Sequence, residues 1–133
     1  MLLGVYLKDG AKILVAYDGS TFSNRALEES IDLVKRFNGS IVILHVPWEQ
    51  SDDQSRWMLL ETGGRAKKAG VRYSLKSERS NNAPEKILQT ANEGRFDCIA
   101  MGSRGVGGAK AWFLGSVSSK VAAEAQCTVL IVK

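Results

Sequence analysis

Cysteine and histidine are scarce in this chain, which contains two cysteines, Cys98 and Cys127, and one histidine, His45. Without a second histidine, a cysteine cluster or a carboxylate pair at motif spacing, the sequence indicates neither a transition-metal site nor a catalytic triad. Each cysteine begins an apolar run, so we interpret both as buried thiols rather than as a disulfide or a redox pair. We therefore expect a protein of the reducing cytoplasm.

Long apolar runs are also absent, and no stretch approaches the roughly 18 apolar residues that a membrane-spanning helix requires. Met1 to Leu7 are apolar but lack the basic region and the small-residue cleavage site of a signal peptide. The chain has no linker, low-complexity tract or internal repeat. A chain of 133 residues is therefore expected to fold as one domain without a membrane partner.

The charge pattern does not indicate a nucleic-acid partner. Lysine and arginine total 18 against 14 acidic residues, which gives a formal net charge of +4, but no basic block occurs. The densest group, Arg65, Lys67 and Lys68, has helical spacing and is typical of a solvated helix face. A small ligand that carries phosphate groups would suit the positive surplus equally well.

Short runs rich in aliphatic, β-branched and aromatic residues predict five strands. These are Lys12 to Tyr17, Ser40 to Val46, Val71 to Lys76, Asp97 to Met101 and Thr128 to Val132. The first, second and last contain continuous apolar stretches, as expected of parallel strands covered on both faces. The third alternates apolar and polar residues, which favours a sheet edge.

Capping residues and apolar spacing predict four helices between these strands. The first helix is expected to be capped by Ser23 or Asn24 and to end at Asn38 and Gly39, and the second to span about Asp53 to Ala69. The third is expected to begin with a capping box at Asn82 and Glu85 and to end at Gly94, and the fourth to start at Ser116 or Ser118. Alternating strands and helices predict an α/β domain with a doubly wound open parallel sheet, strand order 3-2-1-4-5 and helices on both faces. Ligands of such sheets bind where the winding reverses, outside the carboxyl ends of strands one and four.

Glycine is concentrated after the fourth strand, at one of those two ends. The residues are Gly102, Gly105, Gly107, Gly108 and Gly115. A loop of this kind can turn several N–H groups toward one anion, and the next helix adds its own N-terminus. The alternative is a flexible surface loop. The dinucleotide fingerprint is absent after strand one, and the P-loop pattern fails because Ala109 precedes Lys110.

Gly102-Ser-Arg-Gly105, nine further residues and then Gly115-Ser116 resemble the G-x2-G-x9-G-(S/T) motif of the ATP-binding branch of the universal stress protein family. The resemblance extends over Lys12 to Lys133. Asp18-Gly19-Ser20 after the first strand and Leu44-His45-Val46 at the end of the second also match. Residues 1–11 are then an N-terminal extension, and residues 12–133 are the nucleotide-binding domain.

This resemblance implies a set of residues that bind ATP, together with Mg²⁺ or Mn²⁺. The positions that match Ala16, Tyr17 and Val46 approach adenine, and the position of Asp18 lies near the ribose, the phosphates and a metal ion. The backbone from Gly102 to Gly105 and from Gly115 to Ser118 surrounds the ribose and phosphates. The expected binding set is Ala16, Tyr17, Asp18, Val46, Met101, Gly102, Arg104, Gly105, Gly115, Ser116, Val117 and Ser118, with Asp18 as the metal ligand.

The residues themselves leave other interpretations open. Asp18 can also serve as a turn-forming acid, and Arg104 is either a partner for an anion or a solvated side chain. We interpret His45 as a packed, hydrogen-bonded structural residue. No residues of the Pro47 to Gly70 region could be matched to the family, so its ligand contacts stay open.

The favoured function is an ATP-binding regulatory or stress-response module. The resemblance also implies a homodimer through the strand Thr128 to Val132, whose apolar edge invites pairing. Two alternatives are a slow ATPase or autophosphorylating enzyme, with Ser20, Ser116 or Ser118 as acceptors, and a nucleotide-free dimeric interaction module.

Overall fold

Strands and helices alternate along the part of the chain that the computed structural model describes, residues 7–104 and 115–133. The elements are β1 (Lys12–Ala16), α1 (Thr21–Phe37), β2 (Ser40–His45), α2 (Asp52–Lys68), β3 (Arg72–Ser77), α3 (Ala83–Glu93), β4 (Cys98–Gly102), α4 (Ser116–Glu124) and β5 (Thr128–Val132). The strands form one parallel sheet in the order β3-β2-β1-β4-β5. The predicted fold class and strand order are confirmed.

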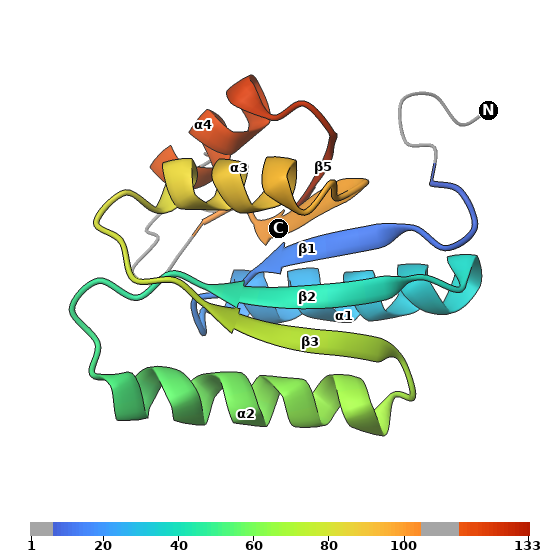
Figure 1. Ribbon diagram of the computed structural model, residues 1–133, viewed down its shortest axis with the longest axis horizontal. Coiled ribbons are helices and arrows are strands. Elements are labelled where there is room, and N and C mark those ends of the chain that lie inside the picture. The colour runs from blue at the N-terminus through green and yellow to red at the C-terminus, as the bar shows by residue number, and fades with distance from the viewer. Residues whose placement is uncertain (1–6, 105–114) are drawn as a thin grey trace.

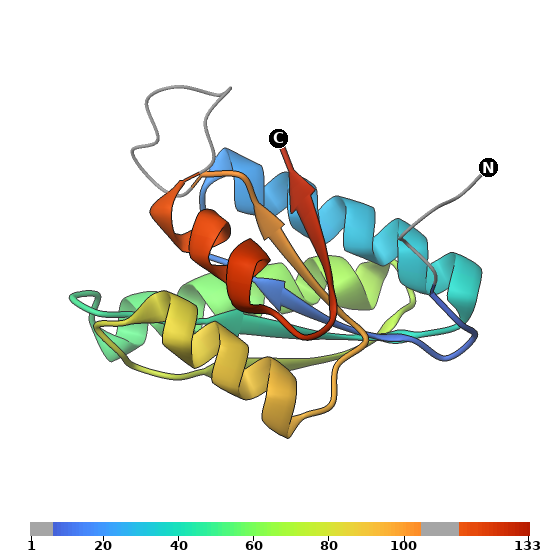
Figure 2. The same cartoon turned by 90° about the horizontal axis from the view of Figure 1, so that it is seen from above.

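The helices cover the two faces of this sheet in pairs, α1 and α2 on one face and α3 and α4 on the other (Figures 1 and 2). Alternate residues of the central strands supply the two halves of the core, because successive side chains of a strand point to opposite faces. Ile13 and Val15 belong to the cluster that packs with α1, whereas Leu14 packs with α3 and α4. The sheet is thus buried on both sides, as the continuous apolar runs predicted.

The two cysteines belong to opposite halves of this core. Cys98 packs in the cluster that contains Ile13, and Cys127 packs against the cluster that contains Leu14. Burial raises the pKa of the Cys98 thiol to about 12 and also raises the pKa of Cys127. Both are free thiols, and the neutral thiol is a poor nucleophile. The interpretation as free thiols is confirmed; Cys98 is buried as expected, whereas Cys127 is only half-buried.

The outer strands match their predicted environments. Residues of β3 alternate between exposed and half-buried over most of the strand, which confirms the wetter face that the sequence indicated. Every residue of β5 is half-buried, consistent with its position at the other sheet edge. Within the described ranges, no helix is both long and apolar enough to cross a membrane.

The first helix begins earlier than predicted. Its cap was expected at Ser23 or Asn24, but α1 starts at Thr21. The hydroxyl of Ser20 is the cap and accepts a hydrogen bond from the Ser23 N–H at 3.1 Å. The Ser23 hydroxyl and the Asn24 amide both donate back to the Ser20 carbonyl, each at 3.0 Å. The side chains of Ser23 and Asn24 thus form hydrogen bonds with the backbone of the first turn. Residues with this ability are also common caps, which is why both resemble caps in the sequence.

The other boundaries differ from expectation by a residue or so. Asn38 takes the left-handed conformation that ends α1, and Gly115 is the N-cap of α4, which begins at Ser116. Asn82 caps α3 through its side chain, but only half of the expected capping box forms, because the Asn82 N–H bonds to the Ser80 hydroxyl.

The expected N-terminal extension, residues 1–11, lies partly outside the described residues. Of the part that is described, Leu7 and Ala11 are buried in the same cluster as Ile13. The Gly10 N–H donates to the carbonyl of Phe37 at 2.6 Å, and the Ser40 N–H donates to the carbonyl of Ala11 at 3.0 Å. Residues 7–11 are therefore integrated with the end of α1 and the start of β2.

Gly102 allows the first turn of α1 to lie directly against the end of β4. A Cβ atom at this position would lie 2.5 Å from the Cβ of Phe22 and 2.9 Å from the backbone nitrogen of Ser23. These distances are far below van der Waals contact, so a side chain would force α1 away from the sheet. Gly102 is thus required by packing.

We predict that Gly102→Ala lowers the free energy of unfolding by about 1–3 kcal/mol because of this overlap. The matched control is Gly64→Ala, since Gly64 lies within α2 and an added Cβ would meet nothing within 4 Å. Replacing a helical glycine there should raise the free energy of unfolding by about 0.5–1 kcal/mol. Urea denaturation of both variants measures the two effects, and equal stability of Gly102→Ala and the wild type would contradict the packing role.

Candidate functional site

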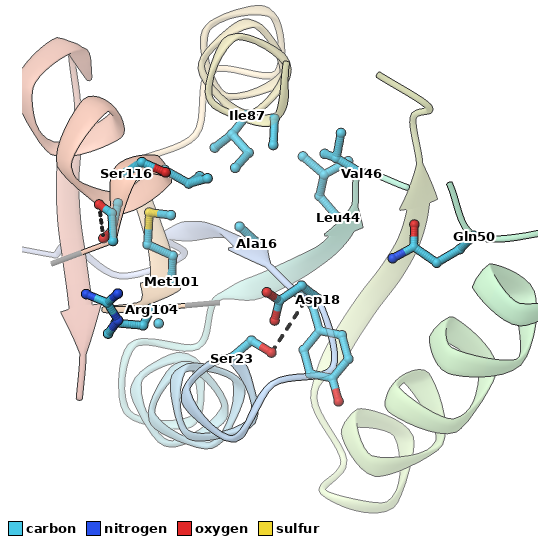
Figure 3. Close-up of a pocket in the computed structure, with 16 residues that line it drawn as sticks. Ala16, Asp18, Ser23, Leu44, Val46, Gln50, Ile87, Met101, Arg104 and Ser116 are labelled. Atoms are coloured by element: carbon cyan, nitrogen blue, oxygen red, sulfur yellow. Dashed lines mark hydrogen bonds between the residues drawn. The ribbon is translucent and has the colours of Figure 1, made fainter. Parts of the chain in front are cut away.

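A cavity of about 460 Å³ lies at the carboxyl ends of β1, β2 and β4, where the winding of the sheet reverses (Figure 3). This is the position that the sequence predicted for a ligand site. The lining residues are Ala16, Tyr17, Asp18, Ser23, Leu44, Val46, Gln50, Ala83, Ile87, Met101, Gly102, Arg104, Gly115, Ser116, Val117 and Ser118.

The structure brings the expected binding residues together around this one cavity. All of them line it except Gly105, which lies outside the described residues. The predicted phosphate-cradling loop includes residues 105–114, which lie outside the described part of the chain.

Sequence reasoning missed five lining residues. They are Ser23, Leu44, Gln50, Ala83 and Ile87. Leu44 could have been found, because it pairs in register with Ala16 and a parallel neighbour at the same level shares the same face. The contributions of α3 and of the segment after β2 depend on how these elements fold over the sheet, which strand and helix patterns do not specify.

One end of the cavity is apolar. Figure 3 shows Ile87 facing Ala16, Leu44 and Val46 across the cavity, with Met101 beside Ala16. These side chains come from α3, β1, the end of β2 and β4. Apolar surfaces of this kind can bind a flat, uncharged aromatic ring by burying its two faces.

The turn after β1 brings a carboxylate to the same cavity. Asp18 is exposed, and its Oδ1 accepts a hydrogen bond from the Ser20 N–H at 2.9 Å. The Asp18 N–H lies 3.4 Å from the hydroxyl of Ser23, to which it donates. The turn-forming role expected for Asp18 is confirmed, and these bonds fix the position from which its carboxylate faces the cavity.

The end of β4 and the start of α4 form a second polar wall. The carbonyl of Ser103 accepts hydrogen bonds from the Gly115 N–H at 2.6 Å and from the Ser118 hydroxyl at 2.8 Å. Ser118 is 2% exposed, so its hydroxyl is engaged inside the protein rather than as a ligand donor. Ser116, which begins α4, is exposed at the cavity.

The N-cap of α4 is Gly115, which has no side chain to bond the first-turn N–H groups. The backbone N–H groups at a helix N-terminus and the positive end of the helix dipole attract anions. Since Gly115, Ser116 and Val117 line the cavity, the arrangement is suited to a phosphate group.

His45, the last residue of β2, does not line the cavity and bonds the residue that follows β1. It is 2% exposed, and its Nδ1 donates to the carbonyl of Tyr17 at 3.0 Å. Burial lowers the pKa of His45 below its ordinary value, although the bond to Tyr17 and the nearby charge of Asp18 act in the opposite direction. The expectation of a packed, hydrogen-bonded structural histidine is confirmed.

Among the described residues that line the cavity, Asp18 is the one that carries a carboxylate. Within the described ranges, no group of three or more histidine, cysteine, aspartate or glutamate residues could hold a metal. Magnesium commonly keeps several waters and binds through one carboxylate and the phosphates of a nucleotide. One carboxylate beside an anion-binding helix end fits that mode of binding.

The family assignment follows from comparison with known proteins. A model of the universal stress protein family matches residues 11–133. The chain is 32% identical to universal stress protein YxiE of Bacillus subtilis, over 92% of this chain and 98% of that protein. The chain belongs to the universal stress protein family.

Solved structures agree with this fold. A universal stress protein family protein of Arabidopsis thaliana with AMP bound has a TM-score of 0.70 and 25% identity, over 92% of this chain and 91% of that one. A universal stress protein in complex with cAMP has a TM-score of 0.76 and 24% identity, over 92% of this chain and 97% of the other.

We predict that the free energy of unfolding falls as the pH drops below about 6.5, the ordinary pKa of histidine. Because the folded pKa of His45 is lowered, the unfolded chain binds a proton in this range before the folded chain does, so stability is full above this pH and is lost below it. The slope from this residue is at most about 1.4 kcal/mol per pH unit. Urea denaturation between pH 7.5 and pH 5.5 should show a flatter dependence for His45→Asn, and identical slopes would contradict the assignment.

Proposed function

We propose that this protein binds an adenine nucleotide, with ATP as the ligand, and acts as a regulatory or stress-response module of the cytoplasm. One observation carries the proposal: the cavity joins an apolar end to an anion-binding end. Val46 and Ile87 line the first, and Ser116 at the start of α4 lines the second. A nucleotide has the same division between base and phosphates.

The volume and position of the cavity support this proposal. A cavity of about 460 Å³ falls within the range of about 300–1,000 Å³ typical of small-molecule sites. We place the base between Val46 and Ile87, and the phosphates against Gly115 and Ser116. Arg104, which lines the same side as Ser116, supplies a cation for the phosphates.

A relative also supports the choice of adenine. The Arabidopsis thaliana family member, which is 25% identical to this chain, is described with AMP bound. AMP shares its base, ribose and α-phosphate with ATP. The additional phosphates of ATP would extend toward α4 and Asp18, where Mg²⁺ or Mn²⁺ would bind between the Asp18 carboxylate and the phosphates.

We favour binding over turnover because neither Ser118 nor His45 is placed for phosphoryl transfer. The hydroxyl of Ser118 is bonded to Ser103, and the one histidine of the chain, His45, is 2% exposed and does not line the cavity. Slow ATP hydrolysis or transfer to Ser116 is the alternative activity. Release of ADP from bound ATP during prolonged incubation would identify it.

We predict that isothermal titration detects ATP binding to the wild type and an affinity at least about tenfold lower for Ala16→Leu. Ala16 lies in the middle of the cavity wall (Figure 3), so a larger side chain would occupy the space of the base. Ala123→Leu is the matched control, because Ala123 is exposed on α4 and does not line the cavity. Unchanged affinity in Ala16→Leu would exclude this cavity as the site.

The same titration tests the metal. Mg²⁺ should raise the affinity for ATP in the wild type, and Asp18→Asn should lose that increase. The substituted amide retains an oxygen for the Ser20 N–H, which bonds Asp18 in the wild type, so the variant removes the charge and keeps the turn. An equal effect of Mg²⁺ in both proteins would remove Asp18 as the metal ligand.

We also propose a homodimer through β5. Such a dimer would bring two nucleotide sites into one molecule; in the alternative function, it would act as an interaction module without a nucleotide. The supporting observation is the position of β5 at the sheet edge, where each of its residues is only half-buried. Edge strands present unpaired backbone groups and readily pair with another chain. A two-fold axis would pair β5 with its own copy.

We predict that Val132→Lys shifts the protein from dimer to monomer at micromolar concentration, as measured by light scattering. Val132 lies on β5 but is part of neither core cluster, so the substitution places like charges at the proposed interface without unfolding the domain. Ala123→Glu is the control for added charge, because Ala123 is an exposed residue of α4. A wild type that is monomeric at this concentration would contradict the dimer.

A further inference from the structure

The segment between β2 and α2, residues 46–51, forms the wall of the cavity opposite α4. Val46 and Gln50 are its lining residues, and Figure 3 shows Gln50 across the cavity from Arg104 and Ser116. This inference rests on the proposed nucleotide site and concerns how that wall recognises the ligand.

The side-chain amide of Gln50 has a defined orientation. Its Oε1 accepts a hydrogen bond from the Trp48 N–H at 3.1 Å. With the oxygen engaged by the protein, the amide nitrogen is the group presented to the cavity, and Figure 3 shows that nitrogen on the cavity side. Gln50 therefore offers a neutral hydrogen-bond donor beside the apolar end.

Arg79, two residues beyond β3, holds this segment in place. Its Nη1 donates to the carbonyl of Trp48 at 2.8 Å, and its Nη2 donates to the carbonyl of Gln50 at 2.9 Å. The same Nη2 bonds the carboxylate of Asp52, the first residue of α2, at 2.8 Å. One planar guanidinium thus joins three points of the wall, a geometry that a lysine ammonium does not reproduce.

The ends of the segment are fixed by other bonds. The Ser80 N–H donates to the carbonyl of Pro47 at 3.1 Å, which continues the pairing of β2 and β3 beyond the strands. At the other end, Ser51 and Gln54 form the capping box of α2. Among these bonds, those of Arg79 are the ones that reach the middle of the segment, where Trp48 and Gln50 lie.

We propose that Gln50 contacts the ligand by donating its amide N–H to an acceptor nitrogen of the nucleotide base, and that Arg79 is the positioning residue for this contact. A neutral donor next to Val46 and across from Ile87 suits the edge of a heterocycle, since the base would be stacked between these apolar side chains. The phosphates bind on the far side, so the contribution of Gln50 is the same for a nucleoside and a nucleotide.

The test compares Gln50→Met, Arg79→Lys and the double variant in isothermal titrations with adenosine and with ATP. Methionine keeps the side-chain length without a donor, and lysine keeps the charge without the planar fork. Each single variant should bind both ligands about threefold to tenfold more weakly, the effect of one lost hydrogen bond. The double variant should bind no more weakly than Gln50→Met, because Arg79 acts through Gln50.

A second substitution separates donor from acceptor. Gln50→Glu retains an oxygen for the Trp48 N–H but offers the ligand no donor, so it should weaken adenosine binding at least as much as Gln50→Met. Arg72→Lys is the matched control, because Arg72, at the start of β3, also donates to a backbone carbonyl, that of Asn38 at 2.7 Å. That carbonyl follows α1 and does not line the cavity, so the control should bind both ligands like the wild type.

The outcomes are distinguishable. Failure of the wild type to bind ATP or adenosine would overturn the proposed function itself. Wild-type binding with unchanged affinity in Gln50→Met would overturn the base contact and leave the nucleotide site intact. Additive losses in the double variant would show that Arg79 acts independently of Gln50 and would overturn its positioning role.

Discussion

The backbone of Ser103 connects the three segments on which the α4 side of the cavity depends. Its N–H donates to the carbonyl of Val132, and its carbonyl accepts from the Gly115 N–H and the Ser118 hydroxyl. Ser103 is fully buried, where an unpaired backbone group would carry a large penalty. These bonds therefore hold the end of β5 and the start of α4 against the end of β4. A Cβ at Gly115 would lie 3.3 Å from the Ser103 carbonyl oxygen, so glycine at this position permits the close approach.

The opposite wall is built by a weaker kind of interaction. Arg79 and Asp52 have side chains that are 42% and 95% exposed, and exposed ion pairs contribute little to stability. The bonds from Arg79 to backbone carbonyls orient the wall more than they stabilise the fold. The cavity thus combines a side fixed by buried backbone bonds with a side whose geometry rests on one solvated guanidinium. Substitutions at Arg79 or Asp52 should therefore alter the second side at little cost to folding.

The fold was predictable because apolar runs and helix spacing are local, and because the right-handed crossover leaves few ways to arrange alternating strands and helices. The positions of Asp18 and Gly115 followed from that topology and from the family motif. The predicted cap of α1 was wrong because Ser20, Ser23 and Asn24 all have side chains that can cap a helix. The path of the chain after β1 decides which of them does so. The contributions of Gln50 and Ile87 could not be predicted, because they depend on how α3 and the segment after β2 fold over the sheet.

Charge at the floor of the cavity gives a reason for a cation in the proposed complex. His45 bonds the carbonyl of Tyr17 next to Asp18, and its lowered pKa keeps the imidazole neutral at physiological pH. Of the described groups, the imidazole therefore adds no positive charge beside Asp18. Arg104 and the start of α4 lie on the other side (Figure 3). In the proposed complex, phosphates that extend from α4 toward Asp18 would meet its carboxylate, and a divalent ion bound by both would offset the repulsion between these anionic groups.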